Sequence, residues 1–94
     1  MSDSTVQRSF TVRRELGLHA RPAGQFVSLA GRFSAEIEVG RDGEWVNGTS
    51  VLSILSLAAT QNTVLTLRAV GADAAEAVEC LGALIEAPND DVVG

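Results

Sequence analysis

The chain has few of the residues, cysteine and histidine, that stabilise many small domains through disulfides or bound metal ions. It contains one cysteine, Cys80, one histidine, His19, and two prolines among its 94 residues. A single cysteine can form no internal disulfide and no two-cysteine zinc pattern, so neither a disulfide framework nor a metal site is expected. Aromatic residues make up only 4% of the chain, so aliphatic side chains must build the core.

Long apolar runs and an excess of positive charge are also missing. The first residues are polar, and no segment approaches the roughly 18 apolar residues that a membrane helix needs. The net charge of −5 argues against nucleic acid as a partner, because affinity for nucleic acid comes largely from Lys and Arg. We therefore expect a cytoplasmic protein without membrane insertion and without a nucleic-acid partner.

Alternation of apolar and polar residues predicts four strands, each with one covered face. The pair Asp42-Gly43 between the middle two runs is typical of a tight hairpin turn. The weakest of the four is the run that follows this turn. The predicted strands are residues 10–13, 35–39, 44–47 and 65–69.

Helical spacing of apolar residues predicts two longer helices, over residues 20–30 and 74–85. Gly31 is expected to end the first helix in a left-handed conformation, and Asp73 to cap the start of the second. A shorter helix over residues 51–59 follows Ser50, another favoured cap.

The element order is strand, helix, strand, strand, short helix, strand, helix. Helices can cover only one face of such a small antiparallel sheet, so the order predicts an α+β fold, a two-layer sandwich. We expect residues 1–94 to form a single domain. Its folded core should span about residues 6–86, with a flexible tail over residues 87–94.

His19 stands at the start of the first predicted helix. Unpaired backbone N–H groups and the positive end of the helix dipole meet there, so a neutral imidazole is placed to take a phosphoryl group. Arg21 could pair with the phosphate, Pro22 fits the first turn, and Gly17 gives the backbone freedom to present the histidine. The alternatives are a surface or capping histidine and a solvated arginine. The motif reads Gly17-Leu18-His19-Ala20-Arg21-Pro22-Ala23.

Three segments resemble the HPr family, the histidine phosphocarriers of the bacterial sugar phosphotransferase system. Residues 16–23 with 25–27 resemble its active-site signature, residues 46–57 its regulatory-serine region, and residues 63–69 with 71–74 its last strand and helix. The likeness runs from about residue 9 to residue 85, in the family's order and spacing. It implies an open-faced sandwich of four antiparallel strands under three helices. The nitrogen-related branch of the family, usually called NPr, is resembled as well, and the choice between branches stays open.

The resemblance also implies a phosphocarrier rather than a stand-alone enzyme. In the family, an enzyme I-type donor phosphorylates the histidine on Nδ1, here His19, and an enzyme IIA-type acceptor takes the phosphate. Arg21 matches the arginine that stabilises it. No bound cofactor is implied, and we expect a monomer. The residues by themselves do not select one ring nitrogen.

Ser50 matches the family's regulatory serine, the substrate of an HPr serine kinase/phosphorylase. Val51, Leu52 and Leu55 match an apolar docking patch. From the residues alone, Ser50 is equally a helix cap, and the three aliphatic residues could belong to the core. The rival function is a regulatory binding module of the same fold, acting through phosphorylation of Ser50 and partner binding.

Overall fold

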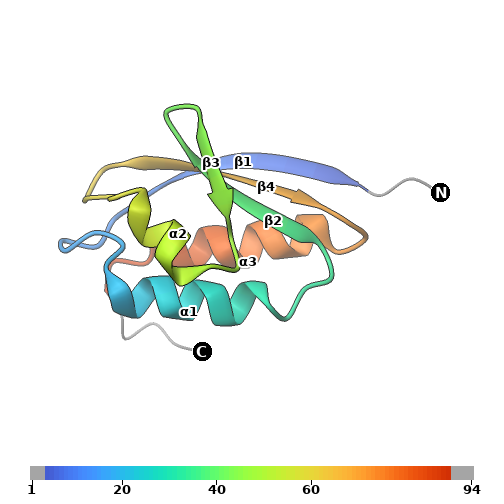
Figure 1. Cartoon of the computed structure of the whole chain (residues 1–94), viewed down its shortest axis with the longest axis horizontal. Helices are drawn as coiled ribbons and strands as arrows, with labels where there is room; N and C mark the ends of the chain where they lie inside the picture. The colour runs from blue at the N-terminus through green and yellow to red at the C-terminus, as the bar shows by residue number, and fades with distance from the viewer. Residues whose placement is uncertain (1–3, 90–94) are drawn as a thin grey trace.

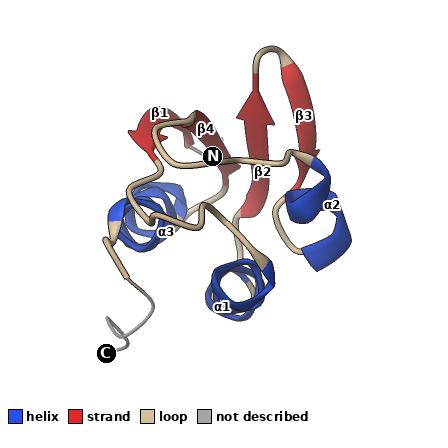
Figure 2. Cartoon of the chain, turned by 90° about the vertical axis from the view of Figure 1, so that its left-hand side faces the viewer, coloured by secondary structure: helices blue, strands red, loops and turns tan. Residues whose placement is uncertain are grey.

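The computed structural model describes residues 4–89, which form a sheet with helices packed on one of its faces (Figure 1; Figure 2). This arrangement confirms the predicted open-faced sandwich. Its other face, drawn uppermost in Figure 1, carries no helix within residues 4–89. The elements are β1 (Thr5–Thr11), α1 (Ala20–Ala30), β2 (Glu36–Arg41), β3 (Glu44–Asn47), α2 (Val51–Ser56), β4 (Val64–Val70) and α3 (Ala74–Glu86).

The sheet is antiparallel throughout, with the strand order β1-β4-β2-β3. β4 lies inside it and pairs with β1 from Thr5↔Val70 to Thr11↔Val64. β2 and β3 form the predicted hairpin, whose turn residues Asp42 and Gly43 both have positive φ (53° and 87°). That conformation gives a tight turn matching the twist of the strands, which is why the Asp-Gly signal was reliable.

β1 begins five residues earlier than the sequence pattern indicated. It is an edge strand, and three residues in its middle, Gln7, Arg8 and Ser9, are all exposed. A strand whose side chains meet water on both faces shows no apolar alternation, so the pattern becomes visible only at buried Phe10.

The core lies between the sheet and the helices. The inward residues of β4, Leu65, Leu67 and Ala69, are fully buried, as is Phe26 of α1. α3 adds its own apolar face against β1 and β4, and its largest fully buried side chains are Leu81 and Ile85. As the composition predicts, aliphatic side chains fill most of this layer.

The first helix ends differently from the expectation for Gly31. This glycine has φ −66°, ordinary right-handed backbone, and its N–H donates to the Val27 carbonyl at 3.0 Å. The next residue, Arg32, donates to Leu29 at 3.0 Å, so the chain leaves α1 through a tightened final turn. The predicted left-handed cap is therefore wrong, because shorter-range bonds satisfy the last carbonyls instead.

Asp73 precedes α3 as predicted, but its side chain does not cap that helix. Its carboxylate instead accepts from the backbone N–H groups of Ser34 at 2.9 Å and Ala35 at 2.8 Å. The Ser34 bond is the main reason that the pKa of Asp73 lies below its usual value, although partial desolvation opposes it. Asp73 therefore ties the loop before β2 to the start of α3.

α2 is shorter than predicted and ends at Ser56. Ala58 follows with φ +51°, a left-handed conformation that no continuing helix can contain. At the C-terminal end of α3, Ala87 is buried, at 7% exposure, and donates its N–H to the Leu84 carbonyl at 3.3 Å. Residues 90–94 of the predicted tail lie outside the described residues. α3, the longest helix within residues 4–89, has 13 residues, and none of the helices there could cross a membrane.

Candidate functional site

His19 is the N-cap residue of α1, the helix whose first turn lies at the left-hand end of the molecule in Figure 1. Its backbone is extended (φ −78°, ψ −169°), its side chain is half-buried, and its carbonyl accepts from Ala23 at 3.0 Å. The first turn of α1 contains no acidic residue. By helix geometry the N–H groups of Ala20 and Arg21 have no partner inside the helix. Pro22 has no backbone N–H group, so it leaves no donor unpaired there. The imidazole therefore stands beside an anion-attracting helix start.

The backbone that leads to His19 is fixed on both sides. Gly17 has φ +73°, and the next residue, Leu18, is 5% exposed and donates its N–H to the Ala59 carbonyl at 2.9 Å. On the other side, Pro22 is buried in the first turn of α1. His19 thus lies between two anchored residues, which fix the position of its backbone.

Arg21 lies two residues beyond His19, in the first turn of α1, and is exposed. From that position its long side chain can follow an anion held at the helix start. A guanidinium offers paired donors that match phosphate oxygens. The structure thus places a cation, backbone donors and an imidazole in one turn of helix.

Ser50 is the N-cap of α2, as predicted, and its Oγ accepts from the Ser53 N–H at 3.2 Å. The serine is half-buried, and its hydroxyl oxygen already caps the start of α2. A phosphate at this position would meet the positive end of a short helix and be tolerated within the molecule.

The three predicted docking residues differ in how exposed they are in the structure. Leu52 is 81% exposed, whereas Val51 and Leu55 are half-buried and pack against the core. A further exposed apolar side chain, Leu16 at 78%, lies in the loop before Gly17 and was not among the predicted docking residues. Leu16 does stand at the start of residues 16–23, the segment that resembles the active-site signature.

Two loops distant in sequence meet beside the helix start. α1 and α2 pack against each other, and residues 57–63 after α2 lie along residues 12–18 before α1 (Figure 2). Val12 donates to Thr63 at 2.9 Å and accepts from Asn62 at 2.8 Å. Within residues 4–89, no group of three or more His, Cys, Asp or Glu side chains is placed to hold a metal ion.

Comparison with known proteins agrees with this geometry. A family model described as "PTS HPr component phosphorylation site" matches residues 6–87. HPr-like protein Crh of Bacillus subtilis (strain 168) is 42% identical over 81 residues, which cover 86% of this chain and 95% of the relative. Phosphocarrier protein HPr of Haemophilus influenzae is 49% identical over 69 residues, 73% of this chain and 81% of the relative.

Solved structures show the same fold. A crystal structure of phosphocarrier protein HPr from Bacillus anthracis superposes with a TM-score of 0.84 at 41% identity, covering 88% of this chain and 99% of the other. The crystal structure of Crh from Bacillus subtilis, described as a swapped dimer, superposes with a TM-score of 0.70 at 41% identity. It covers 89% of this chain and 99% of that one.

Proposed function

This chain belongs to the HPr family of the bacterial phosphotransferase system, and from that premise we propose that it carries phosphoryl groups on His19. It accepts the group from a phosphohistidine of an enzyme I-type protein, itself charged by phosphoenolpyruvate, and donates it to an enzyme IIA-type acceptor in the cytoplasm. The observation that supports this most is the place of His19, the N-cap of a helix whose first turn holds an arginine and no acidic residue.

The transfer exchanges one nitrogen–phosphorus bond for another. An unprotonated nitrogen of His19, which we assign as Nδ1, attacks the phosphorus, and the imidazole of the donor leaves with the electron pair of the broken bond. The proton on the other nitrogen of each ring stays in place, so no separate general base is needed. Because the bonds formed and broken are alike, the second transfer to the acceptor runs by the same chemistry.

The protein's contribution is position and charge. The N–H groups of Ala20 and Arg21 and the Arg21 guanidinium stabilise the phosphoryl oxygens once they arrive. Gly17 and Pro22 hold the backbone on either side of the ring. Leu52 and Leu16 supply exposed apolar surface for brief contact with successive partners, since a small interface suits weak exchange.

The test is to incubate the pure chain with enzyme I and phosphoenolpyruvate and to measure acid-labile phosphate. The wild-type chain should become labelled, and His19→Ala should not, while circular dichroism shows that the variant keeps its fold. Acid-labile phosphate on folded His19→Ala, or none on the wild-type chain, contradicts the proposal.

The relation to Crh favours a second candidate, a regulatory module acting through Ser50. A serine phosphate is stable in acid, so the lability of the label separates the two functions. An HPr serine kinase/phosphorylase would be the partner for that modification.

We propose that the carrier acts as a monomer, because His19 has to reach two partners in turn. Sedimentation would reveal a swapped dimer of the kind described for Crh.

A further inference from the structure

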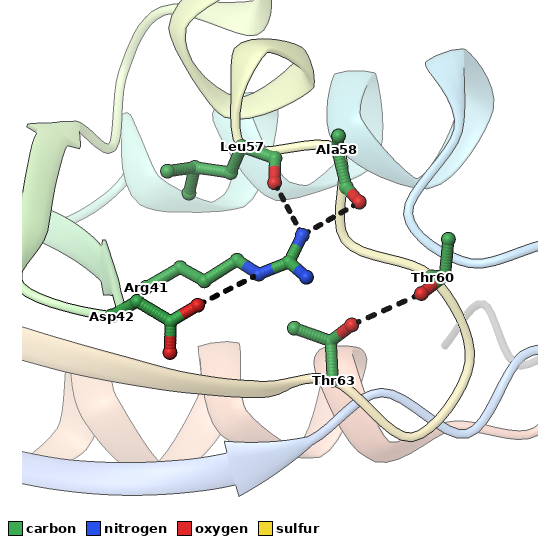
Figure 3. Close-up of polar contacts among 6 residues, drawn as sticks. All are labelled: Arg41, Asp42, Leu57, Ala58, Thr60 and Thr63. Carbon is green, nitrogen blue, oxygen red and sulfur yellow. Dashed lines mark hydrogen bonds and ion pairs between the residues drawn. The ribbon is translucent and has the colours of Figure 1, made fainter.

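Arg41, the last residue of β2, reaches from the hairpin to the end of α2 (Figure 3). Its Nη1 donates to the carbonyl oxygens of Leu57 at 2.7 Å and Ala58 at 2.8 Å. Its Nε lies 3.6 Å from the carboxylate of Asp42, a side chain that is 90% exposed. An ion pair so open to water adds little, so the two charge-assisted bonds to the carbonyls hold the Arg41 side chain.

The backbone that Arg41 holds does not form easily without help. α2 has only six residues, too few for a helix to be stable alone, and its last turn contains no basic residue. After the C-cap residue Leu57, Ala58 takes a left-handed conformation that any residue with a Cβ disfavours. Arg41 supplies donors for the carbonyls on both sides of this turn and a positive charge at the negative end of the helix.

The next residue supports the loop that carries His19. Ala59 is 7% exposed, and its carbonyl accepts from the Leu18 N–H at 2.9 Å. The same carbonyl borders Gly17, where a Cβ would overlap it. The far end of this segment is held separately, by the bonds of Asn62 and Thr63 to Val12. Ala59 therefore depends on the turn at Ala58 for its position.

We propose that Arg41 is a positioning residue for His19. It fixes the Ala58 turn, the turn fixes the Ala59 carbonyl, and that carbonyl fixes Leu18, the residue directly before the histidine. The inference rests on the proposed function, because its consequence is the rate at which His19 accepts phosphate. If the support loosens, the ring is aligned with the donor phosphorus less often, and misplacement by about 1 Å can cost on the order of 100-fold in rate.

The experiment compares full-length variants as acceptors from enzyme I charged with phosphoenolpyruvate. Arg41→Met keeps the length of the stem and removes the donors. With Arg41→Met as the acceptor, we expect the kcat of enzyme I to fall about tenfold and the KM for the acceptor to stay within about twofold of the wild-type value. The reason is that the variant loses positioning of His19 rather than docking. Arg41→Lys, which keeps the charge and one donor group, should fall between Arg41→Met and the wild type.

Arg68→Met is the matched control. Arg68 is also a half-buried arginine with a strong partner, Glu38 at 2.6 Å, but it lies on the face of β4 turned away from the helices. The variant loses the same charge and should keep the wild-type kcat. An equal loss of kcat in both variants would mean that charge alone matters, and would overturn the inference.

A second substitution tests the proposed route through the turn. Glycine adopts the left-handed conformation freely, so Ala58→Gly added to Arg41→Met should restore kcat to within about twofold of the wild type. Hydrogen exchange of the Leu18 amide should quicken about tenfold in Arg41→Met and slow again in the double variant. Wild-type kcat and wild-type Leu18 exchange in Arg41→Met overturn the inference.

Two further outcomes are distinguishable. If the wild-type chain accepts no phosphate, the proposed function fails, while exchange at Leu18 still tests the support by Arg41. If Arg41→Met does not fold, Arg41→Gln takes its place, since its amide keeps one neutral donor. It should show smaller changes in the same direction, and unchanged kcat and Leu18 exchange in that variant also overturn the inference.

Discussion

Gly17 lies so close to the Ala59 carbonyl that no side chain fits between them. Its backbone is left-handed (φ +73°), and an added Cβ would also meet the Cα of Thr60 at 3.0 Å. These neighbours are backbone atoms, which cannot move aside as a flexible side chain can. The loop that leads to His19 is thus built against a second loop, and glycine is what lets them touch.

Gly17→Ala should therefore destabilise the fold by about 2 kcal/mol or more, from backbone strain and from the clash with Ala59. Denaturation by urea would measure it. Gly24→Ala is the matched control, because an added Cβ at Gly24, in the interior of α1, meets no atom within 4 Å. That variant should gain about 0.5–1 kcal/mol from helix propensity. Equal destabilisation of the two variants would contradict the role assigned to Gly17.

The features that the sequence predicted correctly depend on near neighbours in the chain. The turn at Asp42-Gly43 depends on the conformation of two adjacent residues. The Ser50 cap depends on one hydrogen bond from the N–H of Ser53, three residues later. The strands and helices follow from periodic burial on one face. Local chemistry of this kind is present in the sequence itself, so it can be recognised before the fold is known.

The features that were missed depend on contacts between distant segments. Aspartate is a residue type that favours helix caps, yet the carboxylate of Asp73 accepts from the N–H groups of Ser34 and Ala35. The fold brings the loop before β2 within reach of Asp73. Arg41 gives no sign in the sequence that it holds Leu57 and Ala58. In the candidate site, the position of His19 at a helix start was predictable, and the support of its loop by the segment after α2 was not.

Arg21→Ala should still accept phosphate but more slowly. One charge-assisted hydrogen bond contributes about 1.5–3 kcal/mol, so the loss should be roughly ten- to a hundredfold in transfer rate, with little change in stability at this exposed position. Rapid-quench measurement of transfer in both directions would show it. Arg32→Ala, an exposed arginine beyond the other end of α1, is the control and should transfer normally. Wild-type rates for Arg21→Ala would make Arg21 a solvated helix residue only.

Leu52→Ser should weaken partner binding without weakening the fold. The side chain is 81% exposed, so its loss should change the free energy of unfolding by no more than about 0.5 kcal/mol. If it contacts enzyme I, the KM of the chain as acceptor should rise several-fold while kcat holds. Val70→Ser removes another exposed apolar side chain, at the end of β4 distant from His19, and should leave KM unchanged. A KM unaltered by Leu52→Ser would place the docking surface elsewhere.

Asp73 should make stability depend on acidity. Its pKa is lowered in the folded chain, chiefly by the Ser34 N–H, so its contribution is present above the unfolded value of about 3.9. That contribution is lost as the pH falls through the folded pKa. Asp73→Asn should thus be less stable than the wild type at pH 7, and the gap should narrow below about pH 4. Asp42→Asn, at a carboxylate that is 90% exposed, is the control and should show a smaller gap at pH 7. A gap for Asp73→Asn that does not change with pH would contradict this.

Ser50 can be tested as a cap and as a regulatory site separately. Ser50→Ala removes the acceptor for the Ser53 N–H and should cost about 1 kcal/mol of stability. Ser50→Asp keeps an acceptor there, and a negative charge at a helix start is favourable by about 0.3–1 kcal/mol, so its stability should hold or rise slightly. Thermal unfolding of the two variants distinguishes them.

If Ser50 is regulatory, Ser50→Asp should accept phosphate from enzyme I more slowly although it is fully folded. The loss would then come from the new charge beside Leu52, the exposed residue of the docking patch. Repulsion between charges at a surface is screened by salt, with a Debye length of about 10 Å at 0.1 M and about 3 Å at 1 M. Transfer by Ser50→Asp should therefore approach the wild-type rate as salt is raised. Aspartate carries less charge than a phosphate, so phosphorylated Ser50 should show the larger loss. Normal transfer by both forms at low salt would leave Ser50 a helix cap and nothing more.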